Sequence, residues 1–451
     1  MTSFSPGPAA PVPLTYEQEW YLARGRGIRT RRNVRLSFRI LGPLDTDRFE
    51  EAVRLFIARH DALRMALVLN DSVETPDAQQ VSPVRPHDRS ITTQSVTAGS
   101  ADQFSRYAAA VFSRDVLTPL GGEKRPFTLR LLRHDTEHHA FLATFNNVFF
   151  DGRAHDLFSR EIWRDYTTLR DPGGVPPTAA PSFARAALAR HESRSVRRLE
   201  RARTSWHERI EFAARNRWQE PAASPTPSGS VHVRLSASAV EELREHCKSA
   251  RCTVMHWLVG SFVRAVATHT EQRRVSLWTS LDSRGPTERD TVGMFAGSAP
   301  LAINAPGAPL HEVVAEVAGA MVDALRHQQL PACDLTALLT APPAAGTSGG
   351  PLPLVGDIYV NLRSFPGPLR SARNSSSLRI TADAYPLRRI TLKDSSALHL
   401  RCNEYRDGVL IDLLFDGQRA GRPLAQSIVD QIVSDTTAVT SRRLSSERFL
   451  P

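Results

Sequence analysis

Apolar and polar side chains alternate along one stretch in the first half of the chain. Residues 141–145 show the period of two that is typical of a buried strand. Asp151 and Gly152 then mark a sharp turn, and apolar residues between 154 and 163 recur at helical spacing. The pattern predicts a strand that runs through a tight turn into a helix.

The same two periods divide the rest of the chain into strands and helices. Strands are predicted at 35–41, 126–133, 137–145, 230–235, 275–281, 378–382, 397–402 and 408–415. Helices are predicted at 49–59, 101–113, 182–213, 254–268, 310–327 and 422–440, with N-caps such as Thr15, Asp45, Thr253 and either Ser236 or Ser238. Residues 69–92 are predicted to be loop. The mixture predicts an α/β (α+β) fold whose two halves share a related layout.

Proline-rich stretches at 170–181 and 220–230 interrupt this pattern. A chain of 451 residues, 41% hydrophobic, is long enough for two domains. We therefore predict a disordered lead at 1–12, an N-terminal lobe at 13–175 and a C-terminal lobe at 176–451.

Composition excludes several classes of protein. No run of about twenty apolar residues is present, so no membrane span is expected. The N-terminus lacks the basic start and apolar core of a secretion signal. Four cysteines do not make a disulfide framework, and a reducing cytoplasmic location fits them. Cys247 and Cys252, with His246 and His256 nearby, match no zinc spacing, so neither a metal nor a bound cofactor is predicted.

The formal charge of +10 is carried mostly by arginine. One cluster comprises Arg24, Arg26, Arg29, Arg31 and Arg32, and another comprises Arg194, Arg197, Arg198, Arg201 and Arg203. Neither cluster is interleaved with aromatics in the way that nucleic-acid binding requires. Solvated helix faces and the docking of an acidic partner both remain open.

Four segments of the chain resemble a known family. The motif Asn146-Asn147-x-x-x-Asp151-Gly152 resembles the His-His-x-x-x-Asp-Gly motif of nonribosomal peptide condensation domains. Residues 59–65 resemble the family's Arg-His-Glu-x-Leu-Arg-Thr, residues 292–298 its Val-Gly-x-Phe-Val-Asn-Thr, and residues 357–364 its Val-Asn-Leu strand. The resemblance extends from about 13 to 440. It assigns a structural role at a helix end to His60, whereas His134, His138 and His139 are interpreted as a solvated strand end.

The resemblance implies two chloramphenicol-acetyltransferase-like lobes in a V, with a tunnel between them. Acyl or peptidyl carrier proteins would present the substrates there on phosphopantetheine arms. Asp151 is expected to pair with Arg284 and support the motif loop, and Gly152 suits a turn that needs positive φ or a close backbone approach. The resemblance also suggests a set of residues for the tunnel floor: Phe295, Gly297, Ser298 and Asn361. Val148, Phe149 or Phe150 could block the tunnel.

Both motif histidines are replaced by asparagine, which cannot act as a general base. Asn147 and Asn146 are therefore the candidate catalytic residues through positioning, with His155 as an alternative base. Holding two reactants together supplies roughly 7–11 kcal/mol, whereas a general base supplies about 3–5 kcal/mol. Amide formation is accordingly compatible with asparagine, and ester formation with a hydroxyl acceptor less so.

Two functions follow from the resemblance. The first is a condensation-type acyltransferase in nonribosomal peptide or related natural-product biosynthesis, which joins a carrier-bound acyl or peptidyl thioester to an amine. The alternative is a catalytically inactive condensation-like module that binds a carrier protein and recruits a tailoring enzyme.

Overall fold

The computed structural model describes residues 10–25, 33–68, 76, 78–84, 90–120, 125–218, 225–305, 307–340, 356–364, 373–375, 378–385, 396–405 and 408–440. The chain forms two compact units. Unit 1 contains Met1–Arg194, Ser283–Ala296 and Arg370–Arg388, and unit 2 contains Ser195–Asp282, Gly297–Leu369 and Arg389–Pro451.

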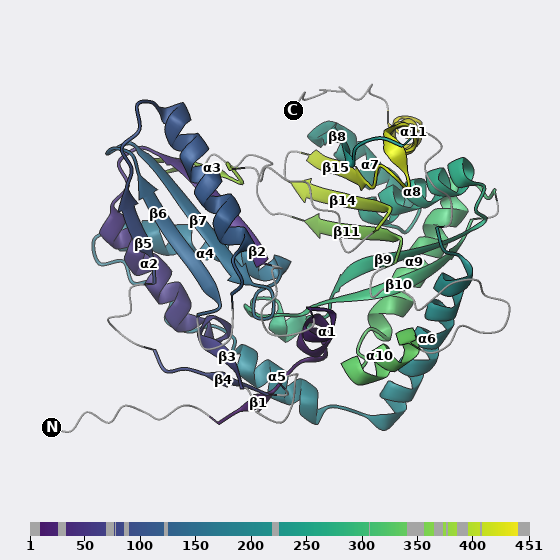
Figure 1. Ribbon diagram of the computed structural model, residues 1–451, viewed down its shortest axis with the longest axis horizontal. Helices are drawn as coiled ribbons and strands as arrows, with labels where there is room; N and C mark the ends of the chain where they lie inside the picture. The colour runs from purple at the N-terminus through teal and green to yellow at the C-terminus, as the bar shows by residue number, and fades with distance from the viewer. Residues whose placement is uncertain are drawn as a thin grey trace. The chain divides into compact units, whose positions relative to one another are not determined.

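Unit 1 is built on a six-stranded sheet of order β12-β13-β2-β7-β6-β5 (Figure 1). Its strands are β2 (Asn33–Leu41), β5 (Thr92–Ser95), β6 (Phe127–Arg133), β7 (His138–Asn146), β12 (Arg373–Ser375) and β13 (Leu378–Ala382). Its helices are α1 (Tyr16–Gly25), α2 (Thr46–Arg59), α3 (Ala101–Leu117), α4 (Gly152–Arg170) and α5 (Phe183–Glu192), with short 3-10 turns at Asp61–Arg64 and Pro286–Glu288. A second sheet joins β1 (Val12–Pro13), β4 (Ala78–Val81) and β3 (Met65–Val68).

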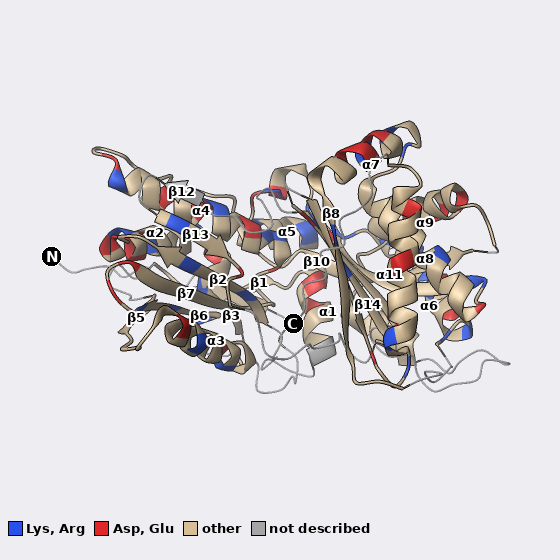
Figure 2. Ribbon diagram, turned by 90° about the horizontal axis from the view of Figure 1, so that it is seen from above, with Lys and Arg blue, Asp and Glu red and all other residues tan. Residues whose placement is uncertain are grey.

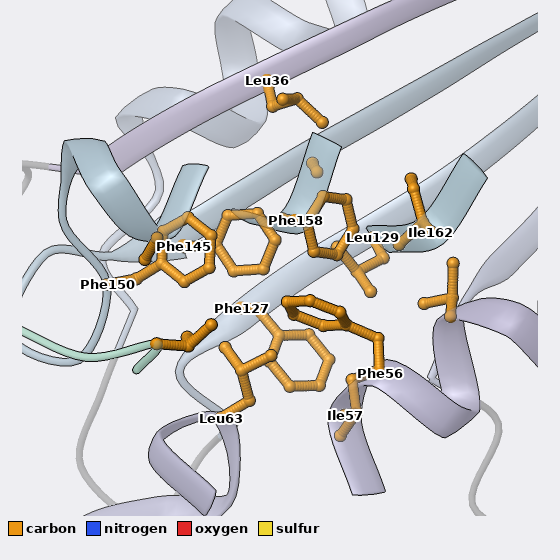
Figure 3. Close-up of a cluster of buried hydrophobic side chains, with 14 of the residues drawn as sticks. Leu36, Phe56, Ile57, Leu63, Phe127, Leu129, Phe145, Phe150, Phe158 and Ile162 are labelled. Carbon is orange, nitrogen blue, oxygen red and sulfur yellow. The ribbon is translucent and has the colours of Figure 1, made fainter. Parts of the chain in front are cut away.

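Both faces of β7 are buried. Phe141, Ala143 and Phe145 pack in one apolar cluster with side chains of α2 and α4, part of which Figure 3 shows. Ala140 and Leu142 pack against α3 in a second cluster. The predicted period of two is thus confirmed, and each face of the strand has its own helical cover.

Unit 2 is built on a six-stranded sheet of order β10-β9-β11-β14-β15-β8. Its strands are β8 (Gly229–Ser236), β9 (Arg274–Asp282), β10 (Ala296–Asn304), β11 (Ile358–Ser364), β14 (Leu398–Tyr405) and β15 (Gly408–Phe415). Its helices are α6 (Val196–Arg215), α7 (Ala237–Ser249), α8 (Val254–Thr270), α9 (Leu310–Arg326), α10 (Ala332–Thr340) and α11 (Gly421–Thr437). The apolar helix α8 contacts both α9 and α11.

The division into units differs from the boundary expected near residue 175. Asp61 explains part of the difference, because its carboxylate accepts hydrogen bonds from the backbone of Phe183 and Ala184 and from Ser182 Oγ, which fixes the start of α5 in unit 1. The predicted helix at 182–213 is in fact two helices that are separated at residues 193–195. Strand β13, expected in the C-terminal lobe, pairs antiparallel with β2 of unit 1.

Two further expectations are corrected. Residues 78–81, predicted to be loop, form β4 between β1 and β3. His139 was interpreted as part of a solvated strand end, but it is 2% exposed because both faces of β7 are covered. Burial, reinforced by the charge of Arg133, lowers the pKa of His139 to about 4.

Candidate functional site

The motif loop begins with an asparagine that is fully engaged in structure. Asn146 is completely buried. Its amide nitrogen donates to the Leu120 carbonyl at 2.6 Å, and its amide oxygen accepts from the Val148 backbone N–H at 2.8 Å. Both ends of the side chain therefore hold the loop, and the proposed role of Asn146 in positioning a substrate stays a prediction.

Asn147 differs from its neighbour in every one of these respects. Its side chain is half-buried. It has no hydrogen-bond partner among the residues that the structure describes. A carboxamide offers two donors and an acceptor, so Asn147 presents the unused hydrogen-bonding capacity of the motif.

The next three residues turn their side chains into the core of unit 1. Val148 and Phe150 are fully buried, and Phe149 is 2% exposed. The Phe150 ring stacks on Phe145 with centroids 3.9 Å apart, and Figure 3 shows the two rings side by side near Phe158. These contacts fold the loop back onto the strand that precedes it, so the three side chains serve as core packing.

The predicted ion pair between Asp151 and Arg284 is present. Arg284 Nη1 lies 2.8 Å from Asp151 Oδ2, and Nη2 lies 3.0 Å from Oδ1. The two side chains are 1% and 3% exposed, respectively. Asp151 also accepts from the backbone N–H groups of Ala154 and Phe295, each at 2.9 Å. One carboxylate thus caps α4 and joins the motif loop to the segment 284–295.

Gly152 and Gly293 flank this ion pair. Gly152 opens α4 without a positive φ, so only a close backbone approach remains of the two expected reasons for glycine there. The carbonyl of Gly293 accepts from the Asp151 N–H at 3.3 Å. A Cβ added at Gly293 would lie 2.2 Å from the Phe183 ring, so the contact requires glycine.

Arg190 is a second support that the sequence did not reveal. Its guanidinium donates to both oxygens of Glu288, at 2.9 and 2.7 Å, and to the carbonyl of Ser283. Arg190 and Arg284 both lie over the Phe295 ring, 4.6 and 4.3 Å from its centroid. Burial opposes ionisation of Glu288, but the hydrogen bonds from Arg190 and Gly285 lower its pKa.

A pair of buried glutamines supports the loop next to Asn147. Gln18 Nε2 donates to the Val148 carbonyl at 3.0 Å, and Gln18 exchanges hydrogen bonds of 2.8 and 2.9 Å with Gln79. Gln18 also accepts from the Thr15 N–H, which confirms the predicted capping box. The capping pattern identified Gln18, but its contact with the loop depends on a strand that the sequence did not predict.

Replacing Gln18 by leucine is expected to lower the free energy of unfolding by roughly 1 kcal/mol, because Val148 and Gln79 lose their partners. The measurement is urea unfolding of wild type, Gln18→Leu, Gln79→Leu and the double variant. If the two glutamines act as one unit, the double variant loses less than the sum of the single losses. Additive losses would show that the pair is not coupled.

The alternative base, His155, lies on α4. It is 7% exposed, and its Nδ1 lies 3.1 Å from Asp156 Oδ1. A partner on the same helix therefore occupies this ring nitrogen. The proposed role of His155 in proton transfer stays a prediction.

The four candidates for a tunnel floor belong to different units. Phe295 is buried in unit 1 beneath the two guanidinium groups. Gly297 and Asn361 are half-buried in unit 2. Ser298 Oγ lies 3.0 Å from the hydroxyl of Tyr359, which lies 2.6 Å from Ser280 Oγ. Strands β9, β10 and β11 thus bring three hydroxyl groups together in unit 2.

The structural role of His60 is confirmed. Its Nε2 lies 3.1 Å from Glu161 Oε2, which also accepts from Arg59 at 2.7 Å. Arg59 also binds Asp165 and the carbonyl of Pro177. Burial opposes ionisation of Glu161, but the hydrogen bonds from His60 and Arg59 lower its pKa. The network fixes α2, α4 and residue 177 together inside unit 1.

Two features of the described residues concern metal binding and membrane crossing. In these ranges, no three side chains of His, Cys, Asp or Glu gather as a metal ion would need. Among the described helices, none combines the length and the apolar character that a membrane crossing requires.

Curated proteins with similar sequences include two synthases. A linear gramicidin synthase protein of Brevibacillus parabrevis is 22% identical over 334 residues, which are 71% of this chain and 4% of that protein. N-(5-amino-5-carboxypentanoyl)-L-cysteinyl-D-valine synthase of Penicillium rubens is 22% identical over 314 residues, which are 68% of this chain and 8% of that protein. The chain therefore spans a small fraction of the length of these relatives.

Solved structures show the same fold. The condensation domain of the Monacolin K polyketide synthase gives a TM-score of 0.73 at 16% identity and covers 97% of this chain and 99% of its own. The first condensation domain of the calcium-dependent antibiotic synthetase, in complex with a substrate analogue, gives 0.70 at 18%, with 97% and 98% covered. The X-domain from teicoplanin biosynthesis gives 0.67 at 20%, with 98% of each chain covered.

A family model agrees with these likenesses. The model described as "Condensation domain" matches residues 9–351, which include the whole motif loop and both of its supports. This chain therefore belongs to the condensation domain family.

Proposed function

We propose that this chain is a condensation-type acyltransferase that joins a carrier-bound acyl or peptidyl thioester to an amine. The amine nitrogen attacks the thioester carbonyl, the carbon–sulfur bond breaks, and the phosphopantetheine arm leaves as a thiol. The proton that the amine releases is transferred to the departing sulfur or to water. Atoms and electrons balance without a redox partner or a cofactor.

The carboxamide of Asn147, which has no hydrogen-bond partner among the described residues, carries this proposal. Around it, the side chains of Asn146, Val148, Phe150 and Asp151 are all engaged in loop or core contacts. A loop held at so many points keeps one polar group in a defined position. Such a group can orient an amine through its oxygen or stabilise a developing oxyanion through its nitrogen.

The energetics favour an amine over a hydroxyl acceptor. An amine is partly unprotonated near neutral pH, so it can attack once it is positioned, and positioning contributes roughly 7–11 kcal/mol. A hydroxyl is a poor nucleophile until a base removes its proton. Asn147 cannot remove that proton, and the Asp151 carboxylate is already occupied by four hydrogen bonds.

The hydrogen bonds that occupy the Asp151 carboxylate also favour a second candidate function. This candidate is a module that binds a carrier protein and recruits a tailoring enzyme. Neither asparagine titrates near neutral pH, and the one carboxylate of the motif is committed to structure. The solved complex of the X-domain and OxyB from teicoplanin biosynthesis contains a chain of this fold, at 20% identity and a TM-score of 0.67.

Asn147 variants distinguish the two candidates. We expect Asn147→Ala to lower kcat for amide formation about tenfold, the value of one lost hydrogen bond. Asn147→His should extend turnover to hydroxyl acceptors by supplying a base. The measurement is mass spectrometry of an acyl-loaded carrier protein incubated with a panel of amines and alcohols.

If Asn147→Ala kept the wild-type kcat for amide formation, this result would contradict the proposed role of the carboxamide. If no acceptor gave a product but the carrier protein still bound measurably, the recruitment module would be the correct function and the acyltransferase would be ruled out. Circular dichroism of each variant controls for folding.

A further inference from the structure

The N-terminal half of α6 concentrates positive charge on unit 2. Its first eight residues, 196–203, include four arginines and one acidic residue, Glu200. Arg203 makes a bidentate ion pair with Asp334, at 2.8–3.0 Å. Arg197, Arg198 and Arg201 are exposed, and none has an ion-pair partner among the residues that the structure describes. Figure 2 shows the basic segments of α6 in blue.

The neighbouring arginine of the same sequence cluster is engaged elsewhere. Arg194 belongs to unit 1, donates to Glu19 at 3.0 Å and lies over the Tyr16 ring. The other arginine cluster, from Arg24 to Arg32, lies outside the residues whose side chains are described. The unpaired charge of α6 is therefore the trio Arg197, Arg198 and Arg201, which we call the α6 arginine surface.

This surface costs the helix stability. Arg197 and Arg201 are four residues apart and Arg198 and Arg201 three apart, so like charges face each other on one side of the helix. They stand near the positive end of the helix dipole, where acidic residues are favoured. The first turn contains no acidic residue, and the N-cap Ser195 makes no side-chain hydrogen bond. Helix stability therefore does not explain the trio.

The helix holds this surface rigidly. The opposite face buries Ala202, Trp206 and Ile210, and the Trp206 indole donates to the His327 carbonyl at 2.8 Å. Val196, next to the trio, is 74% exposed. A row of exposed arginines on a packed helix, beside one apolar side chain, suits a protein surface that presents carboxylates around a small apolar contact.

We propose that the α6 arginine surface docks an acidic carrier protein. This rests on the proposed function, because carrier-bound thioesters are its substrates. Arg197, Arg198 and Arg201 would meet carboxylates on the partner, and long-range attraction to a chain of net charge +10 would speed their encounter. Stacking platforms for nucleic-acid bases are absent from the trio and its described neighbours on α6.

The test compares two triple variants with the same change in net charge. One is Arg197→Glu, Arg198→Glu and Arg201→Glu. The matched control is Arg273→Glu, Arg274→Glu and Arg326→Glu, which are exposed arginines of unit 2 that also have no ion-pair partner among the described residues. The probe is a purified acidic carrier protein with its phosphopantetheine arm, and stopped-flow fluorescence measures the association rate constant.

We expect the α6 triple variant to associate about tenfold more slowly than wild type at low salt, with the difference shrinking in about 0.5 M salt. Its Tm should rise, because glutamates near the start of α6 complement the dipole. The control variant should keep most of the association rate. Equal slowing of both variants, or no slowing of the α6 variant, would overturn the proposal.

Steady-state kinetics of amide formation distinguish a failure of this docking proposal from a failure of the proposed function. At saturating carrier protein the α6 variant should retain the wild-type kcat and show a raised KM for the carrier. If wild type forms no product with any acceptor, the association measurement still tests the docking surface. A lowered kcat with an unchanged association rate would also overturn it.

Discussion

Arg284→Ala is expected to lower the free energy of unfolding of unit 1 by about 3–5 kcal/mol. The substitution leaves the Asp151 carboxylate, 1% exposed, without its counter-charge. It also removes the guanidinium that lies 4.3 Å from the Phe295 centroid. Urea unfolding measures the loss, and hydrogen exchange of residues 146–154 shows whether the motif loop opens first.

The control for Arg284→Ala is an arginine–aspartate ion pair that is exposed to solvent. Arg106 and Asp102 form an i,i+4 ion pair on α3 with side chains 68% and 79% exposed. Arg106→Ala should change stability by less than about 0.5 kcal/mol. A similar small effect for Arg284→Ala would show that the buried pair does not hold the loop.

Acidification is expected to destabilise unit 1 through His139. The pKa of this side chain is lowered to about 4 by burial in the folded chain, against an ordinary value of 6.5. Between these two values the unfolded chain takes up a proton that the folded chain refuses. The contribution of His139 to stability is therefore complete above pH 6.5 and is lost as the pH falls toward 4. We expect this loss to be about 2 kcal/mol, somewhat less than the pKa difference alone would give.

His139→Leu removes this titration. We expect the variant to show a shallower fall in the free energy of unfolding between pH 6.5 and pH 4 than wild type. Comparison of the two proteins at pH 8, where His139 is neutral in both states, separates any packing effect from the protonation effect. Parallel pH profiles would show that His139 does not account for the acid sensitivity.

Local signals in the sequence predicted the parts of the fold that depend on local interactions. Asp45 and Thr253 cap their helices as expected, because an N-cap needs only the next turn of backbone. The alternation in β7 predicted a buried strand correctly. By contrast, β13 was assigned to the wrong lobe because its pairing with β2 joins segments far apart in the chain. Strand β4 was missed because Gln79 and Gln80 interrupt any apolar pattern.

In the candidate site, too, some features were predicted from the sequence, and others depend on contacts between segments far apart in the chain. The Asp151–Arg284 pair was predicted from family resemblance, since both residues stand in recognisable segments. Resemblance alone could not separate the roles of Asn146 and Asn147, which depend on where the Leu120 carbonyl lies. The contribution of Arg190 was also invisible, because its partners, Glu288 and Ser283, belong to a segment that returns to unit 1 from unit 2.

That return of the chain makes the two units inseparable as linear fragments. A polypeptide that stopped at Arg194 would lack both the guanidinium that neutralises Asp151 and strand β13, which pairs with β2. Residues 283–296 cannot be excised from unit 2 without cutting between β9 and β10. Dissection of this protein into halves therefore calls for co-expressed pieces that reassociate, since no cut at a single peptide bond separates unit 1 from unit 2.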